Sequence, residues 1–209
     1  MTVTRGAFIV FEGMDRTGKT TQCKRLVANL MNKQLKAEYT NFPDRTTEIG
    51  KVINNYLTMK SEMSDKGIHL LFSANRWEKI SHIKKMLDAG ITVIVDRYCY
   101  SGVAFSAAKG LDLEWCKMSD KGLLKPDRVF FLTMPLKSLE SRSQFGNERY
   151  EVMDFQKKVY DVYKQLQDDT WEVIDANRSI EAVEEDIMKK TLSTIDNLGH
   201  KPIGQIWIP

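Results

Sequence analysis

A glycine-flanked loop near the amino terminus has the residue types and spacing needed to bind phosphate. Four residues separate Gly13 from Gly18, and Lys19 and Thr20 follow directly, which matches the pattern G-x-x-x-x-G-K-[ST]. Such glycines let backbone N–H groups turn inward around an anion, and a following helix adds its positive end. The lysine provides a cation for the outer phosphates, and the threonine hydroxyl can bind Mg²⁺. The loop therefore predicts a site for a nucleoside triphosphate with its Mg²⁺.

Two charged residues inside the loop suggest chemistry beyond binding. Asp15 and Arg16 lie between the two glycines. A carboxylate beside polyphosphate is unfavourable unless it faces another partner, such as a sugar hydroxyl or a cation. An arginine beside the phosphates can stabilise the charge that develops when a phosphoryl group is transferred. The alternative is that both side chains point into solvent.

A second charged pair ends the most hydrophobic strand-like segment of the chain. The sequence VIVDRYCYSGVAF (93–105) places Asp96 and Arg97 directly after an apolar run. An aspartate at the end of such a strand resembles a Walker B position, from which it supports Mg²⁺ directly or through water. Arg97 would then point into the same crevice. The alternative is an ordinary salt bridge at the end of a strand.

Three further residues are candidates for holding a phosphorylated acceptor. Arg45 follows another predicted strand, so Arg45 and Arg97 could converge on one phosphate, which a guanidinium binds bidentately. Phe72 and Arg76 stand four apart and share one face of a predicted helix. The ring could stack on a nucleobase while the guanidinium bonds to its edge. Spacing alone favours a buried Phe72, a solvated Arg76 and an Arg45 on the surface.

These residues need a scaffold that brings the ends of several strands together. Apolar runs predict strands at 7–13, 37–42, 91–97, 127–134 and 171–176. Helical spacing of apolar residues predicts helices after Thr20, from about Asp65 to Gly90, over 152–166 and after Ser179. The segments 42–50 and 141–151 are polar, charged insertions. The alternation predicts one α/β domain over 1–209, with a five-stranded, mostly parallel sheet, helices on both faces and a crevice at the carboxyl ends of the strands.

The composition excludes several classes of protein. The chain has 209 residues, 42% hydrophobic and 28% charged, with a net charge of +3, which fits one packed domain rather than disorder. Three well-separated cysteines favour a reducing intracellular compartment, and the three histidines show no metal-ligand spacing with them. The apolar run at 7–11 is too short for a signal peptide or a membrane span. We therefore expect a cytoplasmic protein without membrane or nucleic-acid partners; nuclear and mitochondrial pools stay open.

Taken together, the motifs resemble the thymidylate kinase (dTMP kinase) family of the eukaryotic and poxviral type. The resemblance rests on RGAFIVFEGMDRTGKTTQ, FPDRTTEIGK, LLFSANRWE, VDRYCYSGVAFSAAKG, KPDRVFFL and GNERYE, from about Arg5 to the final helix. It implies a P-loop nucleoside monophosphate kinase fold with a mobile lid at about 134–151. The implied reaction transfers the γ-phosphoryl group of ATP to dTMP, giving ADP and dTDP for dTTP synthesis. The resemblance also implies a homodimer, formed by helices on one face of the sheet.

The resemblance implies a role for particular residues. The implied ATP-binding residues are Gly13, Arg16, Thr17, Gly18, Lys19, Thr20, Thr21, Arg142 and Arg178. The implied dTMP-binding residues are Asp15, Phe42, Arg45, Phe72, Arg76, Arg97, Ser101, Gly102, Phe105 and Tyr150. The catalytic set is Asp15, Arg16, Lys19 and Arg97, and the Mg²⁺ ligands are Thr20 and Asp96. Within these sets, Asp15 contacts the sugar 3′-hydroxyl, Phe72 stacks on thymine and Arg76 reaches its carbonyl edge. We also expect Phe105 to crowd a ribose 2′-hydroxyl.

Three other functions remain as alternatives. A kinase for UMP or for a deoxynucleoside shares the loop, but a nucleoside acceptor needs a general base and leaves Arg45 and Arg97 without a phosphate. A regulatory nucleotide switch would favour guanine, and the chain has no N-K-x-D signature. A nucleic-acid-dependent ATPase is disfavoured by the modest charge and the absence of a basic tract.

Overall fold

The computed structural model describes residues 4–140 and 148–208, and its centre is a five-stranded parallel sheet. The strands are β1 (Phe8–Gly13), β2 (Ala37–Asn41), β3 (Thr92–Asp96), β4 (Arg128–Thr133) and β5 (Trp171–Asp175). Their order across the sheet is β2-β3-β1-β4-β5, and every neighbouring pair is parallel. The predicted number, positions and direction of the strands are confirmed.

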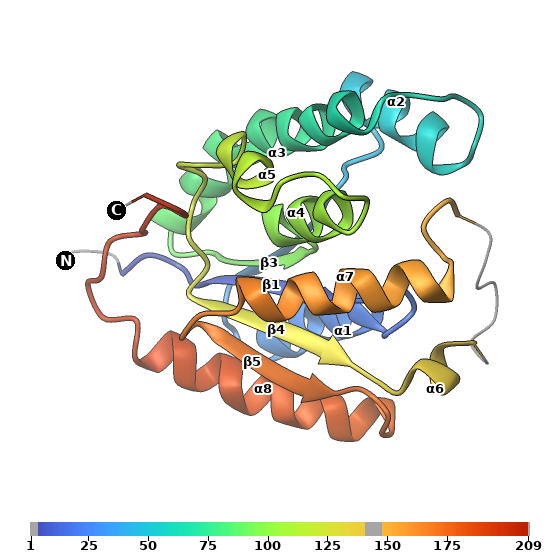
Figure 1. Ribbon diagram of the computed structural model, residues 1–209. Helices are drawn as coiled ribbons and strands as arrows, with labels where there is room; N and C mark the ends of the chain where they lie inside the picture. Colours follow the sequence, from blue (N-terminus) through green and yellow to red (C-terminus); the bar gives the residue numbers. More distant parts are fainter. Residues whose placement is uncertain (1–3, 141–147, 209) are drawn as a thin grey trace.

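Helices cover both faces of this sheet (Figure 1). They are α1 (Lys19–Asn32), α2 (Glu48–Leu57), α3 (Asp65–Asp88), α4 (Cys99–Ala107), α5 (Leu113–Met118), α6 (Leu136–Glu140), α7 (Met153–Leu166) and α8 (Ile180–Asp196). One face is covered by α1 and α8, and the other by α3, α4 and α7. This is the three-layer α/β arrangement that the sequence predicts.

Side-chain caps define where several helices begin. The hydroxyl of Ser64 accepts a hydrogen bond from the third residue of α3, and Ser179 does the same for α8. Both starts agree with the sequence prediction. The charged segment 42–50, expected as an insertion, differs, because Thr47 caps a helix there and α2 begins at Glu48. A capping threonine and a glutamate in the first turn stabilise a helix start even in a polar segment.

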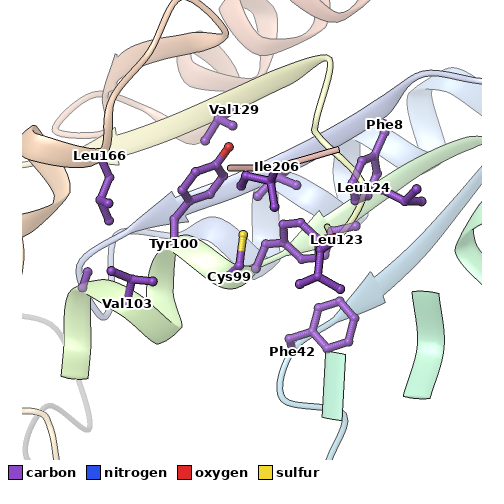
Figure 2. Close-up of a cluster of buried hydrophobic side chains, with 14 of the residues drawn as sticks. Phe8, Phe42, Cys99, Tyr100, Val103, Leu123, Leu124, Val129, Leu166 and Ile206 are labelled. Atoms are coloured by element: carbon purple, nitrogen blue, oxygen red, sulfur yellow. The ribbon is translucent and has the colours of Figure 1, made fainter. Parts of the chain in front are cut away.

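Alternating side chains of the strands form two hydrophobic cores. In β1, Phe8 and Val10 point to the face of α3, α4 and α7, whereas Ile9 and Phe11 point to the face of α1 and α8. All four are fully buried, which explains why the strand is continuously apolar. Figure 2 shows part of the first cluster, in which Tyr100 of α4, Val129 of β4 and Ile206 of the C-terminal segment lie together.

The sheet topology places a crevice at the carboxyl ends of β1 and β3. The chain leaves β1 through α1 on one face and leaves β3 through α4 on the other. Phe11 of β1 pairs with Asp96, the last residue of β3, so the carboxyl ends of the two parallel strands lie side by side. Such a switch in direction is where open α/β sheets bind ligands. The loop at 13–18 and the charged pair at 96–97 therefore meet in one crevice.

Candidate active site

The loop between β1 and α1 has the backbone of a phosphate cradle. Gly13 and Gly18 have φ angles of 138° and 90°, which only glycine adopts readily. A Cβ at Gly13 would lie 2.3 Å from the carbonyl oxygen of Leu132, so the close packing of β1 on β4 also requires glycine. Arg16 has a positive φ of 62° as well. Because α1 begins at Lys19, its free N–H groups open onto the loop.

Lys19 lies inside this loop rather than in solvent. Its ammonium donates to the carbonyl oxygen of Met14 at 2.6 Å and to the hydroxyl of Thr17 at 3.3 Å. The Thr17 hydroxyl in turn donates to Met14, which closes the loop. Burial, with a smaller contribution from Arg97, lowers the pKa of Lys19 to about 8, against the opposing effect of nearby carboxylates. The loop thus holds a buried cation that begins to lose its charge near pH 8.

Thr20 and Asp96 form an oxygen-rich pair at the start of α1. The Thr20 hydroxyl donates a hydrogen bond to the Asp96 carboxylate. The described residues contain no cluster of three or more histidine, cysteine or acidic side chains. A carboxylate with a hydroxyl is nevertheless a fitting donor set for Mg²⁺, which commonly takes one or two protein carboxylates and completes its shell with phosphates and water.

Asp15 and Arg97 form an ion pair beneath the loop. Arg97 also donates to the carbonyl oxygen of Gly13 at 3.1 Å and to the hydroxyl of Ser101 at 3.0 Å. Burial acts to lower the pKa of Arg97, but Asp15 and other nearby acidic groups raise it, so this residue remains a fixed cation. Neither Asp15 nor Arg97 is mainly exposed, so the alternative of a solvated Asp15 is wrong.

A glutamine that the sequence did not single out holds Asp15 in place. The side-chain amide of Gln156 donates to Asp15 Oδ2 at 2.8 Å, and its oxygen accepts from the Asp15 backbone N–H at 3.1 Å. Gln156 is fully buried in α7, where its helical spacing is that of a core residue. No short motif marks it, because the contact joins positions 141 residues apart.

Two glutamates pair with the remaining arginines of the crevice. Arg16 donates to Glu151 Oε1 at 2.7 Å, so it too has a protein partner rather than pointing only into solvent. Arg45 donates to both carboxylate oxygens of Glu148, at 2.8 and 3.1 Å. The predicted site omitted both glutamates, although they lie in the segment GNERYE. Both arginines therefore have a carboxylate partner in this structure.

One cavity, which we call the acceptor cavity, gathers the predicted acceptor residues. Its lining includes Asp15, Phe42, Arg45, Phe72, Arg76, Arg97, Ser101, Gly102, Phe105 and Tyr150. Phe72 and Tyr150 also pack against the small apolar cluster of α2 and α3, and Phe105 contacts the Tyr150 ring with centroids 5.3 Å apart. The walls therefore combine aromatic rings with charged side chains.

A second, larger cleft runs along the phosphate loop. Its lining includes Arg16, Gly18, Lys19, Thr20, Thr21 and Asp96. The cleft and the acceptor cavity share Asp15, Phe42, Pro43, Arg45, Arg97 and Glu148. The two spaces thus meet at a wall that contains two arginines.

One predicted ATP-binding residue, Arg178, lies outside this arrangement. Arg178, at the carboxyl end of β5, donates to Asp186 Oδ2 at 2.6 Å and to the carbonyl oxygen of Asp175 at 3.0 Å. It lines neither of the two spaces described above. Arg142 lies outside the described residues, as does much of the predicted lid.

Arg76, which lines the acceptor cavity, is part of a buried ion pair. Arg76 binds Asp120 through two N–H groups, so the alternative of a solvated Arg76 is wrong. The predicted site did not include Asp120, which is 44 positions away from its partner. Glu12, another buried acid, lies behind the cavity and accepts from the backbone N–H groups of Tyr98 and Ser101 at the start of α4.

Together, the fold and the two connected spaces define a P-loop kinase that acts on a small phosphorylated acceptor. The family model described as thymidylate kinase matches residues 11–187. The chain therefore belongs to the thymidylate kinase family, the ATP-dependent kinases that convert dTMP to dTDP.

Individual relatives agree with this assignment over nearly the whole chain. Thymidylate kinase of Homo sapiens is 48% identical over 211 positions, which cover 99% of this chain and 100% of the relative. A putative thymidylate kinase of Invertebrate iridescent virus 6 is 49% identical over 193 positions, which cover 92% of this chain and 88% of the viral protein. A solved thymidylate kinase structure from Candida albicans superposes with a TM-score of 0.88 at 37% identity, covering 97% of this chain and 98% of that one.

Proposed function

We propose that the two connected spaces hold ATP and dTMP end to end, so that the γ-phosphoryl group passes directly from one to the other. The products are ADP and dTDP. The observation that carries this proposal is the shared wall, in which Asp15, Arg45 and Arg97 line both spaces. In-line transfer requires two anions held close together with their charge neutralised. Fixed cations at the junction supply that neutralisation.

On the donor side, the phosphate loop binds the ATP phosphates. The contributing residues are Gly13, Arg16, Thr17, Gly18, Lys19, Thr20 and Thr21. Thr20 and Asp96 hold Mg²⁺, which when bound neutralises charge on the outer phosphates. Arg16 turns from Glu151 to the transferred group, where its charge counts most as the bond to the leaving group lengthens. Arg178 contacts the adenine side, and we propose the same for Arg142.

On the acceptor side, the aromatic cavity binds the base and the arginines bind the phosphate. Phe72 stacks on thymine, and Arg76 donates to a carbonyl oxygen of the base. Arg45 exchanges Glu148 for the dTMP phosphate, which Arg97 binds from the other side. Asp15 accepts from the sugar 3′-hydroxyl, because a carboxylate paired with Arg97 and Gln156 retains acceptor capacity. Phe105 crowds a ribose 2′-hydroxyl.

This chemistry requires no general base in the protein. A phosphate oxygen of dTMP is already an anionic nucleophile, so the side chains position and stabilise rather than remove protons. A nucleoside acceptor would instead need a base beside its 5′-hydroxyl, and would leave the two junction arginines without a phosphate to bind.

The test is an assay of ADP release with Mg²⁺ and ATP over a panel of acceptors. We expect dTMP to be the best substrate, UMP to be poor because of its 2′-hydroxyl, and thymidine to be inactive. A Lys19→Met variant gives the background rate. The proposal fails if no pyrimidine deoxymonophosphate is phosphorylated, or if thymidine matches dTMP.

We also propose that the chain is one domain that forms a homodimer in a reducing compartment, chiefly the cytoplasm. Three buried free cysteines fit such a compartment. No helix in the described part of the chain is long and apolar enough to cross a bilayer. Light scattering tests the dimer, fractionation tests the compartment, and a DNA-binding assay at low salt tests the expected lack of a nucleic-acid partner.

A further inference from the structure

Arg76 is the cation at the base end of the acceptor cavity, and its orientation is fixed by Asp120. Nε of Arg76 donates to Oδ1 at 3.0 Å, and Nη2 donates to Oδ2 at 2.6 Å. The side chains are 2% and 0% exposed, so water does not compete for this contact. Two parallel hydrogen bonds define the plane of the guanidinium as well as its position.

Asp120 is itself anchored independently of Arg76. Ser73, one turn earlier on α3, donates to Asp120 Oδ1 at 2.8 Å and also lies 2.9 Å from the carbonyl oxygen of Ser119. The indole N–H of Trp77 donates to the same carbonyl at 2.8 Å. Since these contacts attach the segment to α3 without Arg76, we infer that Asp120 positions Arg76 and not the reverse.

The guanidinium also lies directly against Gly102 in the cavity wall. A Cβ at Gly102 would lie 2.7 Å from Nη2 and 3.0 Å from Nη1 of Arg76. Both residues line the acceptor cavity. Among the described residues, Nη1 makes no hydrogen bond. An arginine offers only donors, so a ligand group beside Nη1 must be an acceptor.

We propose that Asp120 is a positioning residue that makes the acceptor site select pyrimidines with a carbonyl oxygen, rather than an amino group, at ring position 4. Thymine and uracil have an acceptor oxygen at that position, whereas cytosine has an N–H donor. A guanidinium held rigidly by Asp120 satisfies the oxygen and leaves the cytosine amine facing another donor. A mobile guanidinium would turn away and tolerate both. This inference rests on the proposed function, which places the base beside Arg76.

The test compares the binding of dTMP, dUMP and dCMP to Asp120→Asn by calorimetry. The amide keeps the size of the side chain but removes its charge and one acceptor. We expect the Kd of dTMP and dUMP to rise about tenfold or more and that of dCMP to change less than about threefold. The preference for dTMP over dUMP, kcat and the KM for ATP should stay within about threefold of wild type. An equal loss for all three nucleotides, or no loss for any, overturns the proposal.

Asp127→Asn is a matched control for the loss of an ion pair. Asp127 also binds an arginine through two hydrogen bonds, from Arg5 at 2.7 and 2.8 Å, and neither residue lines the acceptor cavity. A urea midpoint measured for both variants shows whether they lose comparable stability. Only Asp120→Asn should change the discrimination between dTMP and dCMP. The same change in Asp127→Asn would mean that it follows from stability alone, and would overturn the proposal.

If Asp120→Asn does not fold, two milder variants test the proposal. Ser73→Ala removes one support of Asp120, and Gly102→Ala pushes the guanidinium from the opposite side. Each should weaken dTMP and dUMP more than dCMP, and unchanged selectivity in both overturns the proposal. Arg76→Lys separates this inference from the proposed function. If Arg76→Lys still discriminates between dTMP and dCMP, the placement of the base is wrong. If Arg76→Lys loses this discrimination but Asp120→Asn keeps it, the base is placed correctly and the role of Asp120 is wrong.

Discussion

Each of the described arginines in the crevice is paired with a carboxylate. The ion pairs differ in how readily the arginine can exchange its carboxylate for a phosphate. Arg45 and Glu148 are 39% and 34% exposed, so their ion pair contributes only about 0–1 kcal/mol and a phosphate replaces it at little cost. Arg97 and Asp15 are more enclosed and share further hydrogen bonds. The arrangement therefore combines an arginine that stays fixed with arginines that can turn toward substrate.

Arg16 is the arginine whose loss should slow the chemical step. We predict that Arg16→Ala lowers kcat by about 10³–10⁵, the usual effect of removing an arginine directed at the transferred phosphoryl group. Arg45→Ala is the matched control, because Arg45 also pairs with a glutamate but faces the acceptor phosphate; it should mainly raise the KM for dTMP. Steady-state kinetics measure both. An Arg16→Ala enzyme that loses only affinity for dTMP would contradict this assignment.

The charge of Lys19 should make ATP binding depend on pH. With its pKa lowered to about 8, Lys19 is an ammonium below pH 8 and loses its charge above that pH. Phosphate attracts only the charged form, so the Kd for ATP should rise above pH 8, by up to about tenfold per pH unit. Burial raises the pKa of Tyr39 and of Cys23, which moves these two nearby groups away from this range.

Calorimetric titration from pH 7 to 9.5 measures this effect. The control is Lys19→Arg, whose guanidinium stays charged, so its Kd should be flat over the same range. A wild-type Kd that does not change between pH 7 and 9.5 would show that the charge of Lys19 does not titrate there.

At the scale of elements, Glu12 links the end of β1 to the start of α4. Its carboxylate accepts from the backbone N–H groups of Tyr98 and Ser101 and from the Tyr163 hydroxyl, at 2.9 to 3.1 Å. Burial raises the pKa of Glu12, against the opposing effect of Arg97 and these hydrogen bonds. A buried acid thus fixes the helix that supplies Gly102 and other residues of the acceptor cavity.

We predict that Glu12→Ala lowers the free energy of unfolding by about 3 kcal/mol, because it leaves buried N–H donors unpaired. The variant should also raise the KM for dTMP, since α4 loses its anchor. Glu62→Ala is the control, as its ion pair with Arg149 is exposed; its unfolding energy should change by less than about 0.5 kcal/mol. Urea unfolding measures the free energy of unfolding of each variant. Equal stability of Glu12→Ala and wild type would contradict the anchoring role of Glu12.

The elements that sequence alone predicted are those with a strong local signal. The strands are continuously apolar because helices cover both faces, and Ser64 and Ser179 mark helix starts by capping them. The start of α2 lacked an apolar run and was missed. The phosphate loop was predictable because its chemistry lies in eight consecutive positions, 13–20. Asp120 and Gln156 were not predictable from the sequence, because each acts through a partner that is distant in the sequence and is brought near only by the fold.

At the scale of the whole molecule, the sheet sets the positions of the two connected spaces. The phosphate loop follows β1, the charged pair lies at the end of β3, and the acceptor cavity lies between α3, α4 and the described segment before α7. The described N-terminal and C-terminal segments lie on the side of the molecule away from α6 (Figure 1). The amino-terminal and C-terminal segments are joined there, since Arg5 donates to the carbonyl oxygen of Lys201 at 2.8 Å.

Because the two spaces share one wall, a single molecule that carries both nucleosides should bind across them. We predict that adenosine and thymidine joined through their 5′-oxygens by a polyphosphate stabilise the protein against urea more than ATP and dTMP do separately at the same concentration. Linking the two ends makes the second binding event intramolecular, which raises its effective concentration to about the millimolar range or above. A homologue whose linker is too short to span both sites is the control, and should do no better than one nucleotide. If the long and short compounds stabilise equally, ATP and dTMP do not lie end to end, and the shared wall of Arg45 and Arg97 is not the point of transfer.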